Sequence, residues 1–106
     1  MSRHRRVIIE SPFAGDVERN IAYAKRCMTD SITRGESPIA FHLLLPEVLR
    51  DHQILERDVG IRLSQSWYSA ADACVIYKDF GVTPGMRLGI RAARHFGLVI
   101  TWRSIL

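Results

Sequence analysis

Two segments of this sequence repeat one pattern, an apolar run followed by a glycine-bearing turn and a helix start. The first copy joins residues 7–9 to the turn 11–16, and the second joins residues 73–77 to the turn 80–85. A helix start exposes unpaired backbone N–H groups and carries about half a positive charge, so two adjacent starts form a receptor for a phosphate or a polyol. The repetition therefore predicts two strand-to-helix units and a small-ligand site where their turns meet.

The segments around these units also alternate between strand and helix patterns. Asp16 is a good N-cap, and apolar residues at helical spacing predict a helix over 16–34 with one buried stripe, namely Val17, Ile21, Ala24, Met28 and Ile32. The apolar run 38–45 predicts a second strand, and 46–53 a polar connection. A helix is expected over 54–69, with an apolar stripe of Leu55, Val59, Leu63 and Trp67.

The C-terminal part of the sequence carries clear helix boundary signals. Thr83 as N-cap and Pro84 at the first helical position predict a last helix that ends at Gly97. Its buried stripe is expected to be Met86, Ile90 and Ala93. Residues 98–102 then predict a fourth strand.

Strands that alternate with helices pair in parallel through right-handed crossovers. We therefore expect residues 1–106 to form one domain, a small α/β three-layer sandwich of the flavodoxin or Rossmann type with a parallel sheet of four or five strands. If the strand order is 2-1-3-4, it reverses between the first and third strands, which is where such sheets bind ligands. Both glycine turns would meet at that point.

Composition and cysteine usage indicate where such a chain works. A hydrophobic fraction of 47% is ordinary for a globular protein, and no apolar stretch approaches the ~20 residues that cross a bilayer. We expect no membrane partner. The apolar run that follows the N-terminus is too short for a secretion signal, and Cys27 and Cys74 sit singly in apolar patterns. These features predict buried thiols and a cytoplasmic location.

The net charge and the sequence motifs indicate which classes of partner, metal and cofactor are expected. The formal net charge of +4 favours anionic partners without specifying them. Arg3, Arg5 and Arg6 could contact nucleic-acid phosphates, but no aromatic-rich sheet motif, zinc signature or recognition helix accompanies them, so nucleic acid is a weak alternative. The four histidines lack metal-ligand spacing, and no cofactor fingerprint occurs, so no metal or cofactor is expected.

Several short motifs occur in a distinctive order along nearly the whole chain. They are Ser11-Pro12-Phe13-Ala14-Gly15-Asp16 after the first strand, His42 at the end of the second, Glu56-Arg57-Asp58 opening a helix, and Thr83-Pro84-Gly85-Met86 opening the last helix. In this order and spacing the chain resembles the nucleoside 2-deoxyribosyltransferase-like superfamily. The similarity is closest to a small, largely phage-encoded branch and more distant to the deoxynucleoside 5'-monophosphate N-glycosidases and the transferases proper.

The resemblance implies a nucleotide pocket. It implies that Asp58 contacts sugar hydroxyls, that Thr83 and Gly85 cradle a phosphate or 5'-hydroxyl, and that the base and sugar are walled by Ser11, Phe13 and Gly15. His42 is a further candidate ligand contact. Structural roles are open for the same residues, because Phe13 and His42 also suit a core position, Thr83 would cap its helix with any ligand, and Asp58 would complement a helix dipole.

The resemblance also implies a nucleophilic glutamate four residues after Gly85, where this chain has Gly89. A covalent glycosyl intermediate needs a carboxylate at that point, and glycine supplies none. An interior helical glycine costs about 1 kcal/mol relative to alanine, so a neighbour must need the space. Two explanations are close packing of helix on sheet and a ligand that occupies the vacated volume.

Two functions therefore follow from the sequence. The first is a protein that binds a nucleotide or nucleotide-derived small molecule without turnover, for example a phage protein that sequesters a nucleotide signal. The second is an N-glycosidase or deoxyribosyltransferase in which Asp58, Glu10 or Asp79 replaces the missing acid. The missing glutamate favours the first. The resemblance further implies a homodimer or higher homo-oligomer.

Overall fold

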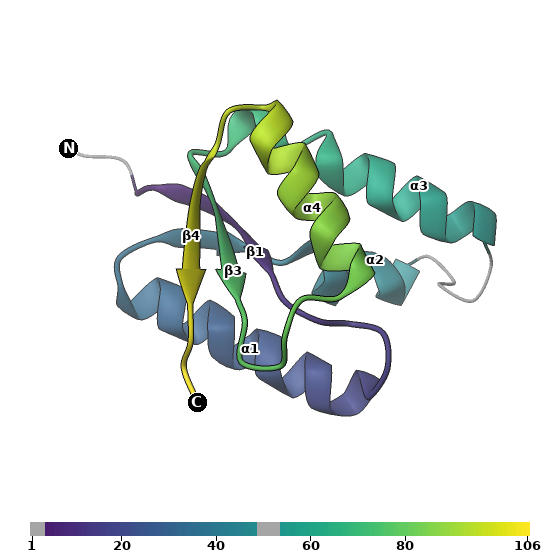
Figure 1. The fold of residues 1–106 in the computed structure, drawn as a ribbon, viewed down its shortest axis with the longest axis horizontal. Coiled ribbons are helices and arrows are strands. Elements are labelled where there is room, and N and C mark those ends of the chain that lie inside the picture. The colour runs from purple at the N-terminus through teal and green to yellow at the C-terminus, as the bar shows by residue number, and fades with distance from the viewer. Residues whose placement is uncertain (1–3, 49–53) are drawn as a thin grey trace.

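A four-stranded, all-parallel sheet forms the centre of the protein (Figure 1). The computed structural model describes residues 4–48 and 54–106. The strands are β1 (Arg6–Glu10), β2 (Ser37–Ile39), β3 (Ala73–Tyr77) and β4 (Val99–Arg103), in the order β2-β1-β3-β4. The expected fold class and strand order are confirmed, and the two strands that precede the glycine turns are the central pair.

Alternate residues of the central strands enter two separate cores, because successive side chains of a strand point to opposite faces. On one face, Val7 and Tyr77 pack with Cys27 of helix α1 (Val17–Thr33). On the other, Ile8 and Ile76 pack with residues of helix α4 (Pro84–His95). Figure 1 shows α1 and α4 on opposite sides of the sheet. Every residue of β3 is consequently buried.

The buried face of α1 differs from the apolar stripe that the sequence predicted. Val17 is 40% and Ile32 59% exposed, whereas the buried residues are Asn20, Tyr23, Ala24, Cys27 and Ser31. Polar side chains can occupy this face because each has a hydrogen-bond partner. The Asn20 amide donates to the carbonyl oxygens of Phe13 and Ala14 at 3.1 and 3.0 Å, which fastens the turn after β1 to the helix. The expected N-cap is confirmed, since Asp16 accepts a hydrogen bond from the Arg19 backbone.

The prediction of a second strand over 38–45 is right only at its beginning. β2 ends at Ile39, and helix α2 (Phe41–Val48) follows immediately. A continuous apolar run has no periodicity that separates a strand from a buried helix, and here the helical alternative holds. The predicted polar connection 46–53 is therefore helical over 46–48, and residues 49–53 lie outside the described part of the chain.

The predicted helix over 54–69 is shorter than expected. Helix α3 (Ile54–Gln65) ends four residues early and is followed by a single 3-10 turn, η1 (Tyr68–Ala70). Its predicted stripe is wrong where side chains are described, because Val59, Leu63 and Trp67 are 36%, 48% and 60% exposed. The buried residue of this region is Tyr68. The side chain of Leu55 lies outside the described residues.

Helix α4 agrees with the sequence signals at both ends. Thr83 caps it through a 3.2 Å hydrogen bond from the Met86 backbone N–H to Thr83 Oγ1, and Gly97 follows the helix with φ +70°. The predicted buried residues Met86, Ile90 and Ala93 are confirmed. Both cysteines are free and buried, as expected. None of the described helices is long and apolar enough to cross a membrane.

Candidate functional site

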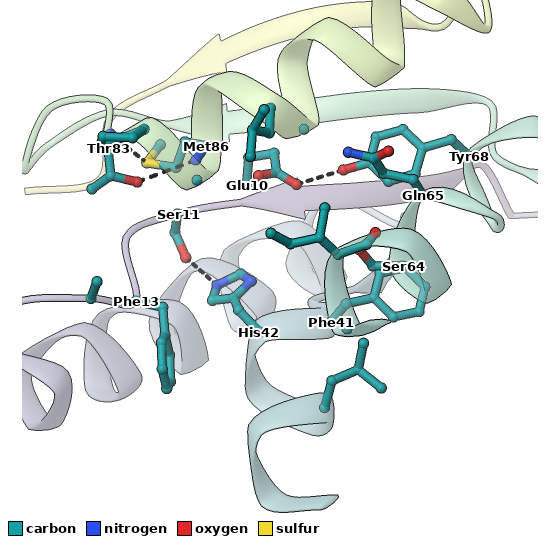
Figure 2. A pocket seen from close by; sticks show the side chains of 18 residues that line it. Glu10, Ser11, Phe13, Phe41, His42, Ser64, Gln65, Tyr68, Thr83 and Met86 are labelled. Atoms are coloured by element: carbon teal, nitrogen blue, oxygen red, sulfur yellow. Dashed lines mark hydrogen bonds between the residues drawn. The ribbon is translucent and has the colours of Figure 1, made fainter. Parts of the chain in front are cut away.

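A pocket of about 290 Å³ lies beyond the carboxyl end of β1, between the turn after that strand, α2, α3 and the first half of α4. This volume is at the lower end of the ~300–1,000 Å³ typical of small-molecule sites. Figure 2 shows its side chains converging from these elements. Residues from the two glycine turns meet here, because both follow central parallel strands that end at one edge of the sheet.

The structure brings most of the sequence-predicted site residues to this pocket. Its lining includes Ser11, Phe13, His42, Thr83, Gly85 and Gly89, together with the alternative acid Glu10. Gly15 is not among the described lining residues, and its φ of +100° suits the turn that leads into α1. Asp58 belongs to α3, but its side chain lies outside the described residues.

One polar pair of the pocket joins the turn after β1 to α2. Ser11 Oγ and His42 Nε2 are 2.6 Å apart. The sequence placed His42 at a strand end, whereas it lies in the first turn of α2 and reaches across to the turn after β1. Burial lowers the pKa of His42 to about 4, so the imidazole is neutral at physiological pH. The pair therefore presents hydrogen-bonding groups to the pocket without a charge.

The carboxyl group of Glu10 fills the space beside Gly89. Glu10 is the last residue of β1, and a Cβ atom built on Gly89 would overlap its carboxyl carbon and both oxygens. The space that the glycine leaves is thus taken by a side chain from the sheet. The packing of the Glu10 side chain against α4 explains why residue 89 has no room for a side chain, and contact between a ligand and Gly89, which lines the pocket, stays a prediction.

The environment of Glu10 is unusual for a carboxyl group. The Tyr68 hydroxyl donates a 2.7 Å hydrogen bond to Glu10 Oε2 (Figure 2). Burial raises the pKa of Glu10 to about 7, although this hydrogen bond opposes the rise. Burial and the nearby Glu10 in turn raise the pKa of Tyr68, which stays protonated. A carboxyl that titrates near neutral pH can act as an acid or a base at physiological pH.

The start of α4 offers open space to a ligand. Thr83 and Gly85 both line the pocket, and the nearest atom to a Cβ built on Gly85 is Thr83 Oγ1, at 3.9 Å. Thr83 Oγ1 itself accepts the hydrogen bond from the Met86 backbone. Pro84 has no N–H and the Met86 N–H is taken by Thr83, so the Gly85 N–H is the backbone donor that this helix start leaves for an oxygen atom of a ligand.

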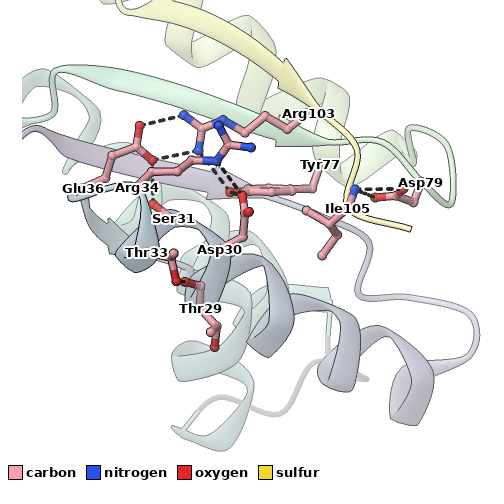
Figure 3. Close-up of polar contacts among 10 residues, drawn as sticks. All are labelled: Thr29, Asp30, Ser31, Thr33, Arg34, Glu36, Tyr77, Asp79, Arg103 and Ile105. Atoms are coloured by element: carbon pink, nitrogen blue, oxygen red, sulfur yellow. Dashed lines mark hydrogen bonds and ion pairs between the residues drawn. The ribbon is translucent and has the colours of Figure 1, made fainter.

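Asp79, another alternative acid, has structural partners and is not among the described lining residues of the pocket. Its carboxylate accepts hydrogen bonds from the Tyr23 hydroxyl and from the backbone N–H groups of Ile105 and Leu106. Figure 3 shows the contact with Ile105. Burial acts to raise the pKa of Asp79, but these hydrogen bonds outweigh it and lower the pKa. Asp79 therefore holds the C-terminal residues against the turn after β3.

A cluster of charged and polar side chains lies where β4 meets the end of α1, and its members form hydrogen bonds and an ion pair with one another (Figure 3). Arg103 Nη2 and Glu36 Oε2 form an ion pair at 2.6 Å, with both side chains 10% exposed. Arg103 also donates to the Tyr77 hydroxyl, which donates to Asp30. Because these groups pair with one another, we assign the cluster to stability.

Sequence reasoning missed several residues of the pocket wall, and the two with the clearest roles are Phe41 and Tyr68. The helical alternative for residues 41–48 would have placed Phe41 and His42 on one short helix that begins beside β1. For Tyr68 no local signal exists, because its partner Glu10 is 58 positions away in the sequence.

The chain belongs to a family described as a domain of unknown function, DUF7768, which matches residues 5–103. Among curated proteins, none matches this sequence. The match spans all four strands and the whole described pocket.

Proposed function

We propose that the pocket binds a nucleoside, a nucleotide or a related nucleotide-derived small molecule. The observation that carries this proposal is the meeting of the two strand-to-helix turns, since Ser11, Phe13, Thr83 and Gly85 line one pocket. The helix start at Thr83 suits the oxygens of a phosphate or sugar. Phe13 and Phe41 add aromatic surface on which a base can stack.

The order of the motifs supports the same ligand class. The residues that the resemblance to the deoxyribosyltransferase-like superfamily assigns to ligand contact, apart from Gly15 and the undescribed side chain of Asp58, lie around this pocket. Sequestration of a nucleotide signal, in a phage-infected cell or elsewhere, remains our preferred role because the expected nucleophile is absent. We also keep the expectation of a homo-oligomer, which light scattering would contradict by giving the 12.1 kDa monomer mass.

The position of Glu10 favours a second candidate, an N-glycosidase or deoxyribosyltransferase. Its carboxyl reaches the pocket beside Gly89 and has a pKa of about 7. In hydrolysis, Glu10 would pass its proton to a ring nitrogen of the departing base as the bond from that base to the sugar breaks. Water would add to the sugar carbon, and the proton that water loses would restore the acid.

One experiment tests both candidates. The protein is titrated by thermal shift and calorimetry with nucleosides, mono- and dinucleotides and ADP-ribose, while chromatography follows released base. Binding without base release supports the sequestering role. Base release that disappears in Glu10→Gln supports the enzyme. If nothing in this panel binds, both candidates are wrong.

A further inference from the structure

We infer that Glu10 contacts the ligand as a neutral carboxylic acid and donates its proton in a hydrogen bond to an acceptor atom of the ligand. This inference rests on the proposed function and specifies its chemistry. The ligand must present a lone pair, such as a ring nitrogen or carbonyl oxygen of a base, opposite Glu10. A ligand that offers only a cation or an N–H donor at this point would not fit.

The position of the Glu10 carboxyl follows from packing. The Glu10 side chain extends from the end of β1 into the space beside residue 89, which is open because that residue is glycine. The Tyr68 hydroxyl contacts Glu10 Oε2. Glu10 nevertheless lines the pocket and is only partly buried by its neighbours. The carboxyl is thus held between α4 and η1 while remaining accessible from the pocket.

Among the described residues, none brings a compensating positive charge to Glu10. None of the ion pairs among the described residues includes Glu10, and the described pocket lining contains neither lysine nor arginine. The described titratable groups around Glu10 are Tyr68 on η1, Cys74 on β3 and, across the pocket, His42 on α2. Burial raises the pKa of the Cys74 thiol and lowers that of His42, so all three are uncharged at neutral pH.

A carboxyl without a counter-charge in such a site favours its neutral form. The Tyr68 hydroxyl already donates to Oε2, so in the acid form the proton resides on Oε1 and is available to a ligand. With a pKa of about 7, the acid form predominates below neutral pH and is lost above it. If only the acid form binds, affinity falls by roughly a factor of 10 for each pH unit above 7.

The first test needs no ligand. Carbon-13 NMR of protein labelled at glutamate carboxyl carbons follows each signal with pH, and the Glu10→Gln variant identifies the signal of Glu10. We expect this carboxyl to titrate near pH 7. A titration near the ordinary glutamate value of ~4.3 would overturn the inference, even if the protein binds nucleosides.

The second test uses adenosine, because it lacks a phosphate that would itself titrate near pH ~6. Calorimetry at pH 6 and pH 9 compares the wild type, Glu10→Gln and the matched control Glu18→Gln, whose side chain is exposed on α1. We expect the affinity of the wild type and of the control to fall by about 100-fold from pH 6 to pH 9. The Glu10→Gln affinity should stay nearly constant, because its amide donates without titrating.

A wild-type affinity that does not change with pH, or a Glu10→Gln variant that retains the wild-type pH dependence, would overturn the inference and leave the binding function intact. Failure of the nucleosides, the nucleotides and ADP-ribose to bind at any pH would instead contradict the proposed function. In that case the NMR titration still decides the protonation of Glu10.

Discussion

Replacing Glu10 by glutamine should stabilise the protein at alkaline pH. The pKa of Glu10 is raised from the ordinary 4.5 to about 7 in the folded protein, so the folded state holds the proton more tightly than the unfolded state. The resulting contribution to stability is fully present below pH 4.5 and is lost as pH rises through 7. Glutamine keeps the size of the side chain and an oxygen for Tyr68, but it cannot ionise.

The size of the effect follows from the pKa shift. Each pKa unit corresponds to about 1.4 kcal/mol, so the free energy of unfolding of Glu10→Gln relative to wild type should grow by about 2.5 kcal/mol between pH 5 and pH 9. Urea unfolding followed by tryptophan fluorescence measures this difference, with Glu18→Gln as the matched control. His42 also makes stability depend on pH, because its lowered pKa reduces stability as pH falls from about 6.5 to 4. This contribution is the same in every variant, so it cancels in the difference from wild type.

A difference between Glu10→Gln and wild type that stays constant from pH 5 to pH 9 would refute this reasoning. It would mean that Glu10 has the same proton affinity in the folded and unfolded states. The Glu10 carboxyl between Gly89 and Tyr68 would then have to be fully solvated or paired with a cation.

Three further predictions concern the same pocket and the charged cluster around Arg103. Gly89→Ala should destabilise the wild type, because the added methyl group overlaps the Glu10 carboxyl. In the Glu10→Ala background the same substitution should stabilise the protein by about 1 kcal/mol, because alanine has the higher helix propensity. Urea unfolding that shows stabilisation in both backgrounds would mean that the Glu10 carboxyl does not lie beside Gly89. Glu36→Gln should lower the unfolding free energy by about 3 kcal/mol, because it leaves Arg103 buried without its counter-charge. Arg34→Gln, which breaks the exposed ion pair with Asp30, should lower the unfolding free energy by under ~1 kcal/mol in the same assay. Equal losses for Glu36→Gln and Arg34→Gln would contradict the difference expected between a buried and an exposed ion pair. Gly85→Asp should weaken nucleotide binding by ~1–3 kcal/mol in calorimetry, because its carboxylate repels an anionic ligand, while Gly85→Ala should leave the affinity unchanged. Equal affinities of the two variants would argue against a ligand at the start of α4.

The secondary structure was predictable wherever a local signal was unambiguous. Thr83 and Pro84 mark a helix start by capping and by a fixed φ, and both act within their own turn. The apolar run 38–45 carried no such signal, so a strand was predicted there and helix α2 was missed. The buried face of α1 was misjudged because Asn20 and Tyr23 are polar, and only their distant partners make their burial favourable.

Local chemistry, read from the sequence alone, determined the strand-to-helix units, their parallel order and therefore the edge of the sheet where Ser11, Phe13, Thr83 and Gly85 gather. It also identified Gly89 as a position where a neighbour needs space. Only the tertiary structure decided that this neighbour is Glu10, that the Tyr68 hydroxyl binds its carboxyl and that Asp79 binds the backbone of the C-terminal residues. The physical reason is that burial and counter-charge, which set the proton affinity of Glu10, depend on residues from β1, η1 and α4 that no local pattern connects.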